Sequence, residues 1–346
     1  MILVDYLPHL MLIVLALLLM SGFPVGAILA GVGVGFGLLG VVIGEYPVQS
    51  LFLIPSKIYM SIGENLTYPA VPMLLFMGVA LEVSGAAREL LLCLQRILGR
   101  APGSMCVSVI LIGLLLAPLA GVIGASVATI AAAALPTMMA QRYRPEVASG
   151  VIAAAGTLGV IAPPAIMLFF LSDAMELTIG SMFLAPILPI LCLAGAFICY
   201  FIVIDVLRPR SGAAAMPSEN GRSILIYLIR SLVLPVGLIA LVLGSIVAGW
   251  VSPTESAAVG AIGGGAMIFL YRGFDLALLR QALVRTMVIT GMVFFVVLGA
   301  GIFSLVFRFY GGDDIAIGLF EDLSIGDFGV LAVVLIILFV LGFFID

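Results

Sequence analysis

Residues 121–129 read Gly-Val-Ile-Gly-Ala-Ser-Val-Ala-Thr, and residues 156–164 read Gly-Thr-Leu-Gly-Val-Ile-Ala-Pro-Pro. Both stretches are rich in small residues and interrupt sequence that is otherwise apolar. Non-helical backbone inside a bilayer is tolerated only where it is buried in protein or lines a wet cavity. Two such breaks close together predict a place where freed carbonyl groups and hydroxyl groups meet an ion or a solute.

The composition indicates a polytopic membrane protein. The chain has 346 residues, of which 64% are hydrophobic and 9% are charged, whereas soluble domains carry about 25% charged residues. Its mean hydropathy is +1.37. Apolar runs of about 20 residues predict helices that span a lipid bilayer, and therefore an all-α fold.

Several function classes are disfavoured by composition. The net charge is −4 and there is no basic stripe, so we expect no nucleic acid partner. His9 is the only histidine, and no His/Asp or Ser/Lys pair lies at matched depth, which argues against an enzyme. The spacing of the four cysteines does not match a metal-binding motif, and we expect them to pack as small apolar side chains. We expect no bound cofactor.

Residues 104–140 are predicted to form a re-entrant hairpin. They are about 37 residues, too few for two full spans and a turn. Arginines stand just before and just after this segment, and basic loops favour the cytoplasm. Both ends would then lie on one side of the membrane, with the hairpin tip at Gly121 to Ser126.

The remaining elements fall into two halves. Asp275, Arg280 and Arg285 are expected on an inner loop, and the acidic residues from Asp313 to Asp327 on an outer loop. Of the 14 Lys and Arg residues, this topology leaves only Lys57 and Arg308 outside, and it places the N-terminus outside. The first half, residues 1–223, comprises scaffold helices, the hairpin, a broken helix at 146–171, a return helix at 181–206 and an inner linker. The second half, residues 224–346, comprises helices at 231–248, 256–271 and 286–307 and the start of a second hairpin.

The two halves echo each other. Residues 21–27 and residues 249–257 are each a turn followed by a small-residue helix. The charge map puts the first turn inside and the second outside, so we predict an inverted repeat, which is typical of secondary transporters. By this alignment Asp346 lies near the tip of a second hairpin, and we expect the sequence to be C-terminally truncated before that hairpin returns.

The first break is a candidate cation site. Hard cations take oxygen ligands, which the hydroxyl groups of Ser126 and Thr129 and the carbonyl groups from Gly121 to Gly124 would supply. The alternative is a small-residue packing interface between helices. We favour the cation site because the hydroxyl groups accompany the glycines.

For the second break, the alternative interpretation is a simple proline kink in a continuous helix. Pro163 and Pro164 remove two N–H donors and free upstream carbonyl groups, while Gly156, Thr157 and Gly159 permit a bend. One proline would suffice for a kink, so we favour a functional break.

A second candidate site involves Asp346, Thr254 and Glu255. Acids at membrane depth are functional candidates. Glu255 also stands at the start of a helix, where a carboxylate stabilises the helix dipole, and we favour that interpretation for it.

At these residues the chain resembles the large membrane subunit of TRAP transporters, the tripartite ATP-independent periplasmic family, also called DctM-like. The resemblance is carried by residues 72–78 (Pro-Met-Leu-Leu-Phe-Met-Gly), 121–129, 156–164 and 252–258 (Ser-Pro-Thr-Glu-Ser-Ala-Ala). It looks closest to the mannitol/chloroaromatic-type branch, a label that says little about the substrate.

The resemblance implies an elevator-type fold of the ion transporter superfamily, in which a domain bearing both hairpins slides against a scaffold. It implies sodium-coupled import across the bacterial inner membrane, with a small TRAP membrane subunit and a periplasmic solute-binding protein that delivers a small organic acid. The family's second Pro-Pro bend is missing here, so a second sodium site would be incomplete. The first sodium site would be formed by Gly121, Gly124, Ser126, Thr129, Gly156, Thr157, Gly159, Pro163 and Pro164.

The alternative is a stand-alone ion-coupled carboxylate or anion carrier of the same superfamily. Co-purification with a small four-helix membrane partner would distinguish the two.

Overall fold

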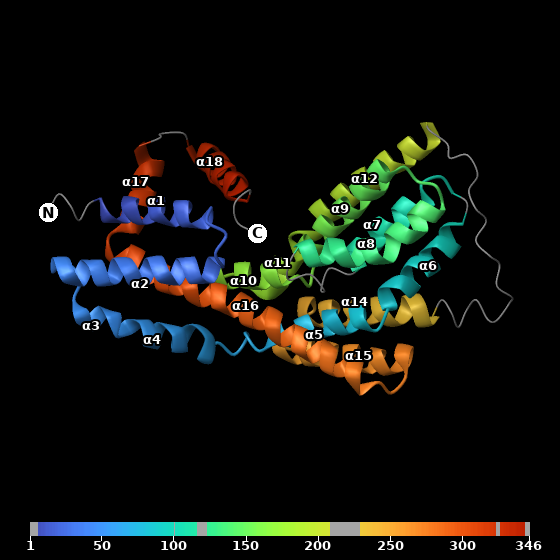
Figure 1. Ribbon diagram of the computed structural model, residues 1–346, viewed down its shortest axis with the longest axis horizontal. Helices are drawn as coiled ribbons and strands as arrows, with labels where there is room; N and C mark the ends of the chain where they lie inside the picture. Colours follow the sequence, from blue (N-terminus) through green and yellow to red (C-terminus); the bar gives the residue numbers. More distant parts are fainter. Residues whose placement is uncertain (1–5, 100, 116–122, 208–228, 323–325, 343–346) are drawn as a thin grey trace. The chain divides into compact units, whose positions relative to one another are not determined.

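The computed structural model describes residues 6–99, 101–115, 123–207, 229–322 and 326–342. Within those ranges every regular element is a helix (Figure 1), which confirms the predicted all-α class. Among the described residues, four segments are long and apolar enough to cross a membrane: Val25–Ile43, Ile179–Leu207, Arg230–Val247 and Leu276–Phe309. Counting each of two bent helix pairs as one span gives up to six in this part of the chain. The chain is therefore a polytopic membrane protein.

The chain divides by its internal contacts into two compact units. The terminal unit comprises residues 1–66 and 291–346, and the central unit comprises residues 67–290. Each unit takes residues from both halves of the sequence.

The terminal unit is built on a close pairing of α2 (Val25–Ile43) with the last part of α16 (Leu276–Phe309). A Cβ atom added at Gly26 would lie 2.7 Å from the Phe295 ring, and one at Gly299 would lie 2.4 Å from the carbonyl oxygen of Gly26. Small residues thus let the two backbones approach. The unit also contains α1 (Leu7–Leu19), α3 (Val48–Leu51), α4 (Leu53–Ile58), a π-helical turn at Tyr59–Gly63, α17 (Gly312–Asp322) and α18 (Gly326–Leu341).

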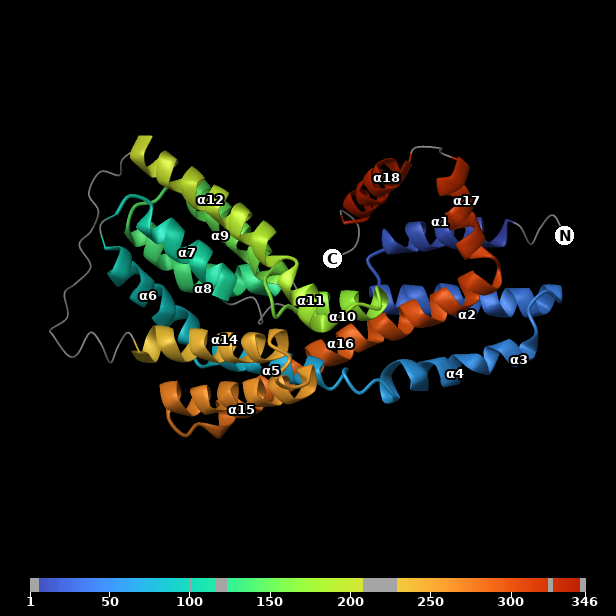
Figure 2. The ribbon, with the colours of Figure 1, turned by 180° about the vertical axis from the view of Figure 1, so that it is seen from behind.

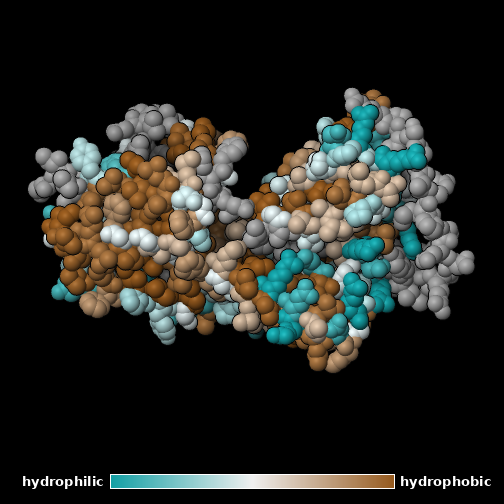
Figure 3. All heavy atoms as spheres, viewed as in Figure 1, coloured by the Kyte–Doolittle hydropathy of each residue, from teal (hydrophilic) through white to brown (hydrophobic). Residues whose placement is uncertain are grey.

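Apolar side chains dominate the exposed face over α1 and α2 (Figure 3). Val42 of α2 is 86% exposed, and Leu17 of α1 is 65% exposed. An apolar surface of this extent indicates contact with lipid or a partner, as expected for membrane helices.

The central unit repeats the glycine-mediated pairing with different helices. A Cβ atom at Gly264 of α15 (Pro253–Arg272) would lie 2.9 Å from the Cα atom of Met77 in α5 (Ala70–Val83). The two helices lie side by side in both views (Figures 1 and 2). The other helices of this unit are α6 (Ala86–Leu98), α7 (Ser104–Leu115), α8 (Ile123–Ala140), α9 (Pro145–Ile161), α10 (Ile166–Ala174), α11 (Ile179–Leu184), α12 (Ile187–Leu207), α14 (Leu234–Val247) and the start of α16.

One predicted helix boundary is wrong. The helix predicted at 286–307 begins at Leu276, so Arg280 and Arg285 lie on α16. Charged residues predict a loop there, although a helix can carry them on one face. Asp313 and Asp314 lie in the first turn of the short helix α17.

Candidate functional site

The candidate site is built where α7 and α8 pack on α9. A Cβ atom at Gly113 of α7 would lie 2.3 Å from the carbonyl oxygen of Ala155, and one at Gly156 would lie 2.3 Å from a methyl carbon of Val127 in α8. Residues 155 and 156 of α9 therefore touch both arms of the predicted hairpin. The described helices of this segment are α7, of 12 residues, and α8, of 18 residues, and residues 116–122 between them lie outside the described residues.

The second break is shorter than predicted, because residues 156–161 are helical and only the turn between α9 and α10 is not. Helix α9 ends at Ile161, α10 begins at Ile166, and the two axes differ by 41°. Ala162 and Ala165 have extended backbone. In an unbroken helix the carbonyl groups of Gly159 and Val160 would accept from residues 163 and 164, but both are proline and have no N–H. The break thus presents carbonyl groups without their helical donors.

Residues 123–129, which were predicted to be part of a break, are helical and form the start of α8, and the contact of Val127 with Gly156 lies beside two of the predicted site residues. Ser126 is buried at the start of α8, directly before the valine that packs on Gly156. Thr157 is exposed, and its hydroxyl group donates to the carbonyl oxygen of Ala154 at 2.9 Å. Gly124 is exposed and Gly159 is buried, while Gly121 lies outside the described residues.

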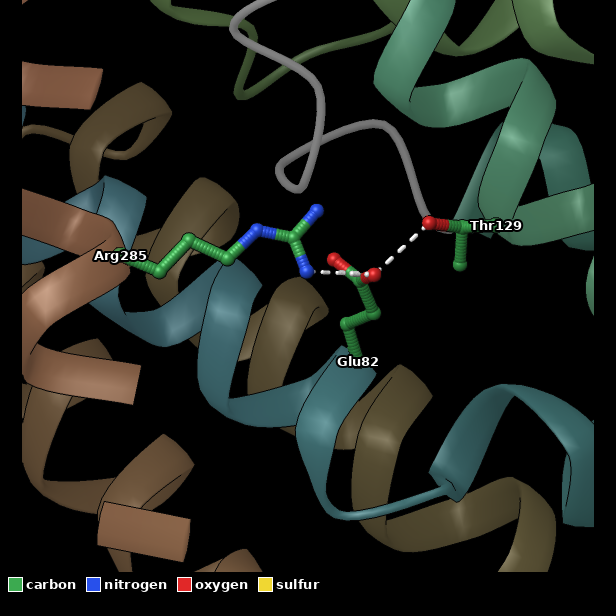
Figure 4. A network of polar contacts seen from close by, with 3 residues as sticks. All are labelled: Glu82, Thr129 and Arg285. Carbon is green, nitrogen blue, oxygen red and sulfur yellow. Dashed lines mark hydrogen bonds and ion pairs between the residues drawn. The ribbon is translucent and has the colours of Figure 1, made fainter. Parts of the chain in front are cut away.

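Thr129 has a partner that the sequence did not suggest. Its hydroxyl group donates to Oε1 of Glu82 at 2.8 Å, and Nη1 of Arg285 donates to the same oxygen at 2.8 Å (Figure 4). The Glu82 side chain is 17% exposed and that of Arg285 is 35% exposed. The carboxylate therefore lies between a cation from α16 and a hydroxyl group from α8.

Glu82 lies next to a sharp elbow. Helices α5 and α6 meet at Ser84 and Gly85 with a bend of 63°. Gly85 has φ of +81°, in the left-handed region that glycine favours. Nε of Arg272 in α15 donates to the carbonyl oxygen of Ser84 at 3.2 Å. The elbow is thus held by arginines from α15 and α16.

A second polar contact joins α5 to α10. The Tyr68 hydroxyl group, just before α5, donates to Oδ2 of Asp173 at 2.7 Å. Its ring also packs edge-on against Phe170, with centroids 5.6 Å apart. This contact fixes the end of α10 after the break.

Glu255 of the second candidate site caps α15. The Ser252 side chain accepts from the Glu255 backbone N–H at 3.3 Å, and the Glu255 carboxylate accepts from the Ser252 backbone N–H at 2.7 Å. This reciprocal pair is a capping box. The backbone and hydroxyl hydrogen bonds from Ser252 lower the pKa of Glu255, which lies at the exposed end of the helix. Thr254 lies beside it in the first turn, and Asp346 lies outside the described residues.

Glu82 and Arg285 are the residues that sequence reasoning missed. Glu82 follows the apolar run of α5, and an acid in such a run is a functional candidate by default. That signal was available in the sequence. Its pairing with Arg285 was not, because the two residues are 203 positions apart.

Chemically, the site offers hydroxyl and carbonyl oxygens from two neighbouring elements. Hard cations are bound by such neutral oxygens. The Glu82–Arg285 pair adds a compensated carboxylate beside α8.

Comparison with known proteins places this architecture in a family. The family model described as "Tripartite ATP-independent periplasmic transporter, DctM component" matches residues 12–346. The chain belongs to this family. The description of that family names a transporter component.

Curated relatives of the DctM family agree with this assignment. The chain is 29% identical over 243 residues to the C4-dicarboxylate TRAP transporter large permease protein DctM of Pseudomonas aeruginosa, a match that covers 70% of this chain and 56% of that protein. It is 26% identical over 290 residues to the sialic acid TRAP transporter large permease protein SiaM of Vibrio cholerae, covering 81% and 65%. The chain spans about half the length of the first curated relatives it matches.

Proposed function

We propose that this chain is the large permease subunit of a sodium-coupled TRAP transporter that imports a small organic acid. The substrate would be delivered by a periplasmic solute-binding protein, and a small membrane subunit would complete the complex in the bacterial inner membrane. The family assignment supports this role.

The observation that carries the proposal is the contact of α8 with α9 at Val127 and Gly156. It sets buried Ser126 beside the helix whose end presents the carbonyl groups of Gly159 and Val160. We infer that sodium binds between these elements, with Thr157 as a further hydroxyl ligand. Sodium is a hard cation, and its binding here would join the hairpin to the broken helix.

The pairing of helices supports the inverted repeat and the elevator mechanism as parts of the same proposal. Helix α2 of the first half packs on α16 of the second, and α15 of the second half packs on α5 of the first. Two interleaved repeats would give this exchange of partners. The two turns also match, with left-handed Gly22 before α2 and left-handed Gly249 before α15.

The substrate class rests on the relatives. The names of these relatives give C4-dicarboxylates, isethionate, sialic acid and ectoine as solutes. Because these solutes differ, we propose only a small organic acid. We also propose that the chain belongs to the mannitol/chloroaromatic-type branch, but this does not identify which of these solutes is transported.

Uptake into proteoliposomes tests the proposal. Vesicles would contain this subunit with its small membrane partner, the binding protein would be added outside, and labelled succinate, sialic acid and isethionate would be the probes. We expect uptake of at least one probe only with an inward sodium gradient and with all three components. Equal uptake with potassium replacing sodium would refute sodium coupling, and uptake by this chain alone would favour the stand-alone carrier.

A further inference from the structure

The first turns of α8 are held on two sides by different chemistry. Successive residues of a helix are rotated by about 100°, so Val127 and Thr129 project about 200° apart. Val127 packs on Gly156 of α9, while Thr129 donates to Glu82 of α5. Buried Ser126 directly precedes Val127 and lies about one helical turn before Thr129. Fixing these two faces fixes the rotation of α8 about its own axis.

The two contacts do not fix the rotational orientation of α8 equally well. The packing of Val127 against a glycine is apolar, and apolar packing has little directionality. A hydrogen bond to a carboxylate requires a particular donor position and is stronger than one between neutral groups. The bond from Thr129 to Glu82 is therefore the contact that selects one orientation.

Glu82 is itself firmly held. Its Oε1 also accepts from Arg285, and the elbow that follows it is tied to Arg272 through the carbonyl oxygen of Ser84. A largely buried carboxylate needs such a partner, because an uncompensated charge at that depth is costly. The acceptor is thus anchored to α15 and α16, and α8 is oriented against it (Figure 4).

We propose that Glu82 is a positioning residue for the cation site, acting through Thr129 to hold Ser126 in its binding orientation. This inference rests on the proposed function, because it assigns a role toward the same sodium site. Thr129 then serves as a support of the site, with its donor proton on Glu82, rather than as a primary ligand. Arg285 donates to the same carboxylate oxygen and holds it in place.

Sodium binding should weaken when the hydrogen bond is removed, because a misoriented α8 must be reordered by the ion. The apparent affinity of a site falls by the fraction of molecules in the competent state. A hydrogen bond to a charged group has a net effect that corresponds to roughly a tenfold change or more in such an equilibrium.

Hydrogen–deuterium exchange on the purified protein in lipid nanodiscs tests the inference without any uptake assay. Thr129→Val removes the donor and leaves the Glu82–Arg285 pair intact, whereas Thr129→Ser restores the hydroxyl group. Thr137→Val makes the same chemical change on α8 away from the elbow. We expect Thr129→Val alone to speed exchange in residues 123–130 and to raise the sodium concentration that half-protects them about tenfold. Thr129→Ser and Thr137→Val should match the parent protein.

Each outcome decides one claim. If Thr129→Val exchanges and responds to sodium as Thr137→Val does, the positioning role is overturned. If sodium protects residues 123–130 in no protein tested, the proposed sodium site fails, and the sodium-free exchange rates alone then decide whether Glu82 orients α8.

Discussion

Replacing Gly156 with alanine tests the contact on which the site is built. The new Cβ atom would lie 2.3 Å from a methyl carbon of Val127 and 3.2 Å from its Cα atom. Valine has little χ1 freedom to move that methyl group away, so α8 must shift. Overpacking of this kind costs about 1–3 kcal/mol, while alanine for glycine within a helix returns about 1 kcal/mol. The net change in the free energy of unfolding is a loss of about 0–2 kcal/mol.

Alanine substitutions at two other glycines should have a smaller and a larger effect on stability than Gly156→Ala. Gly150, also on α9, has nothing within 4 Å of its added Cβ atom, so Gly150→Ala should stabilise the protein by about 0.5–1 kcal/mol. Gly113 would place its Cβ atom 2.3 Å from a backbone oxygen, which no side-chain rotation can relieve. Gly113→Ala should therefore cost more than Gly156→Ala, at the upper end of the ~1–3 kcal/mol range.

Thermal unfolding in nanodiscs measures the order of stability of these three variants. All scans use one fixed rate, because the apparent midpoint depends on the scan rate when unfolding is irreversible. One kcal/mol corresponds to about 2–4 °C for a chain of 150–250 residues and somewhat less for a longer one. We expect the midpoint to fall in the order Gly150→Ala, Gly156→Ala, Gly113→Ala. Adding Val127→Ala to Gly156→Ala should recover part of the loss. A Gly156→Ala protein as stable as Gly150→Ala would refute the close approach of α8 to α9.

Further predictions concern other parts of the chain. Thr157→Val should raise the half-saturating sodium concentration for uptake by about fivefold, whereas an unchanged value would remove Thr157 from the ligand set. Ser252→Ala should lower the free energy of unfolding by about 0.5–2 kcal/mol through loss of the cap, and Glu255→Gln should leave sodium dependence unchanged if Glu255 only caps α15. Tyr68→Phe leaves Asp173 without its 2.7 Å hydrogen bond and should lower the unfolding midpoint, since such bonds contribute about 1.5–3 kcal/mol. Gly264→Ala should destabilise the protein relative to Gly265→Ala, because a Cβ atom at position 265 meets only ordinary contacts at 3.6 Å.

The sequence predicted the fold class because composition and apolar run length depend on single residues and their neighbours. Helix α2 was predicted at its observed bounds, residues 25 to 43, because Pro24 begins it and Gly44 ends it. The start of α16 was predicted too late, since Arg280 and Arg285 resemble loop residues until their partners are known. A break was predicted over residues 156–164, and the structure confirms it only after Ile161, where Pro163 and Pro164 act locally, while residues 156–161 stay helical.

The candidate site was predicted only in part. Ser126 and Gly156 were identified from local composition, and the structure brings their neighbourhoods into contact. The role of Thr129 could not be inferred, because its partner Glu82 lies 47 positions away and belongs to a different helix. Long-range pairs of this kind leave no periodic signal in a single sequence.

The contacts of α9 with α7 and α8 also limit how chain length can vary in this region. One residue inserted within α8 or α9 would turn everything beyond it by about 100°, and glycine would no longer face valine. Insertions and deletions among homologues should therefore collect outside the helices, for example at residues 141–144 between α8 and α9. Gap positions in an alignment of the family would then outline the helices that must keep their register.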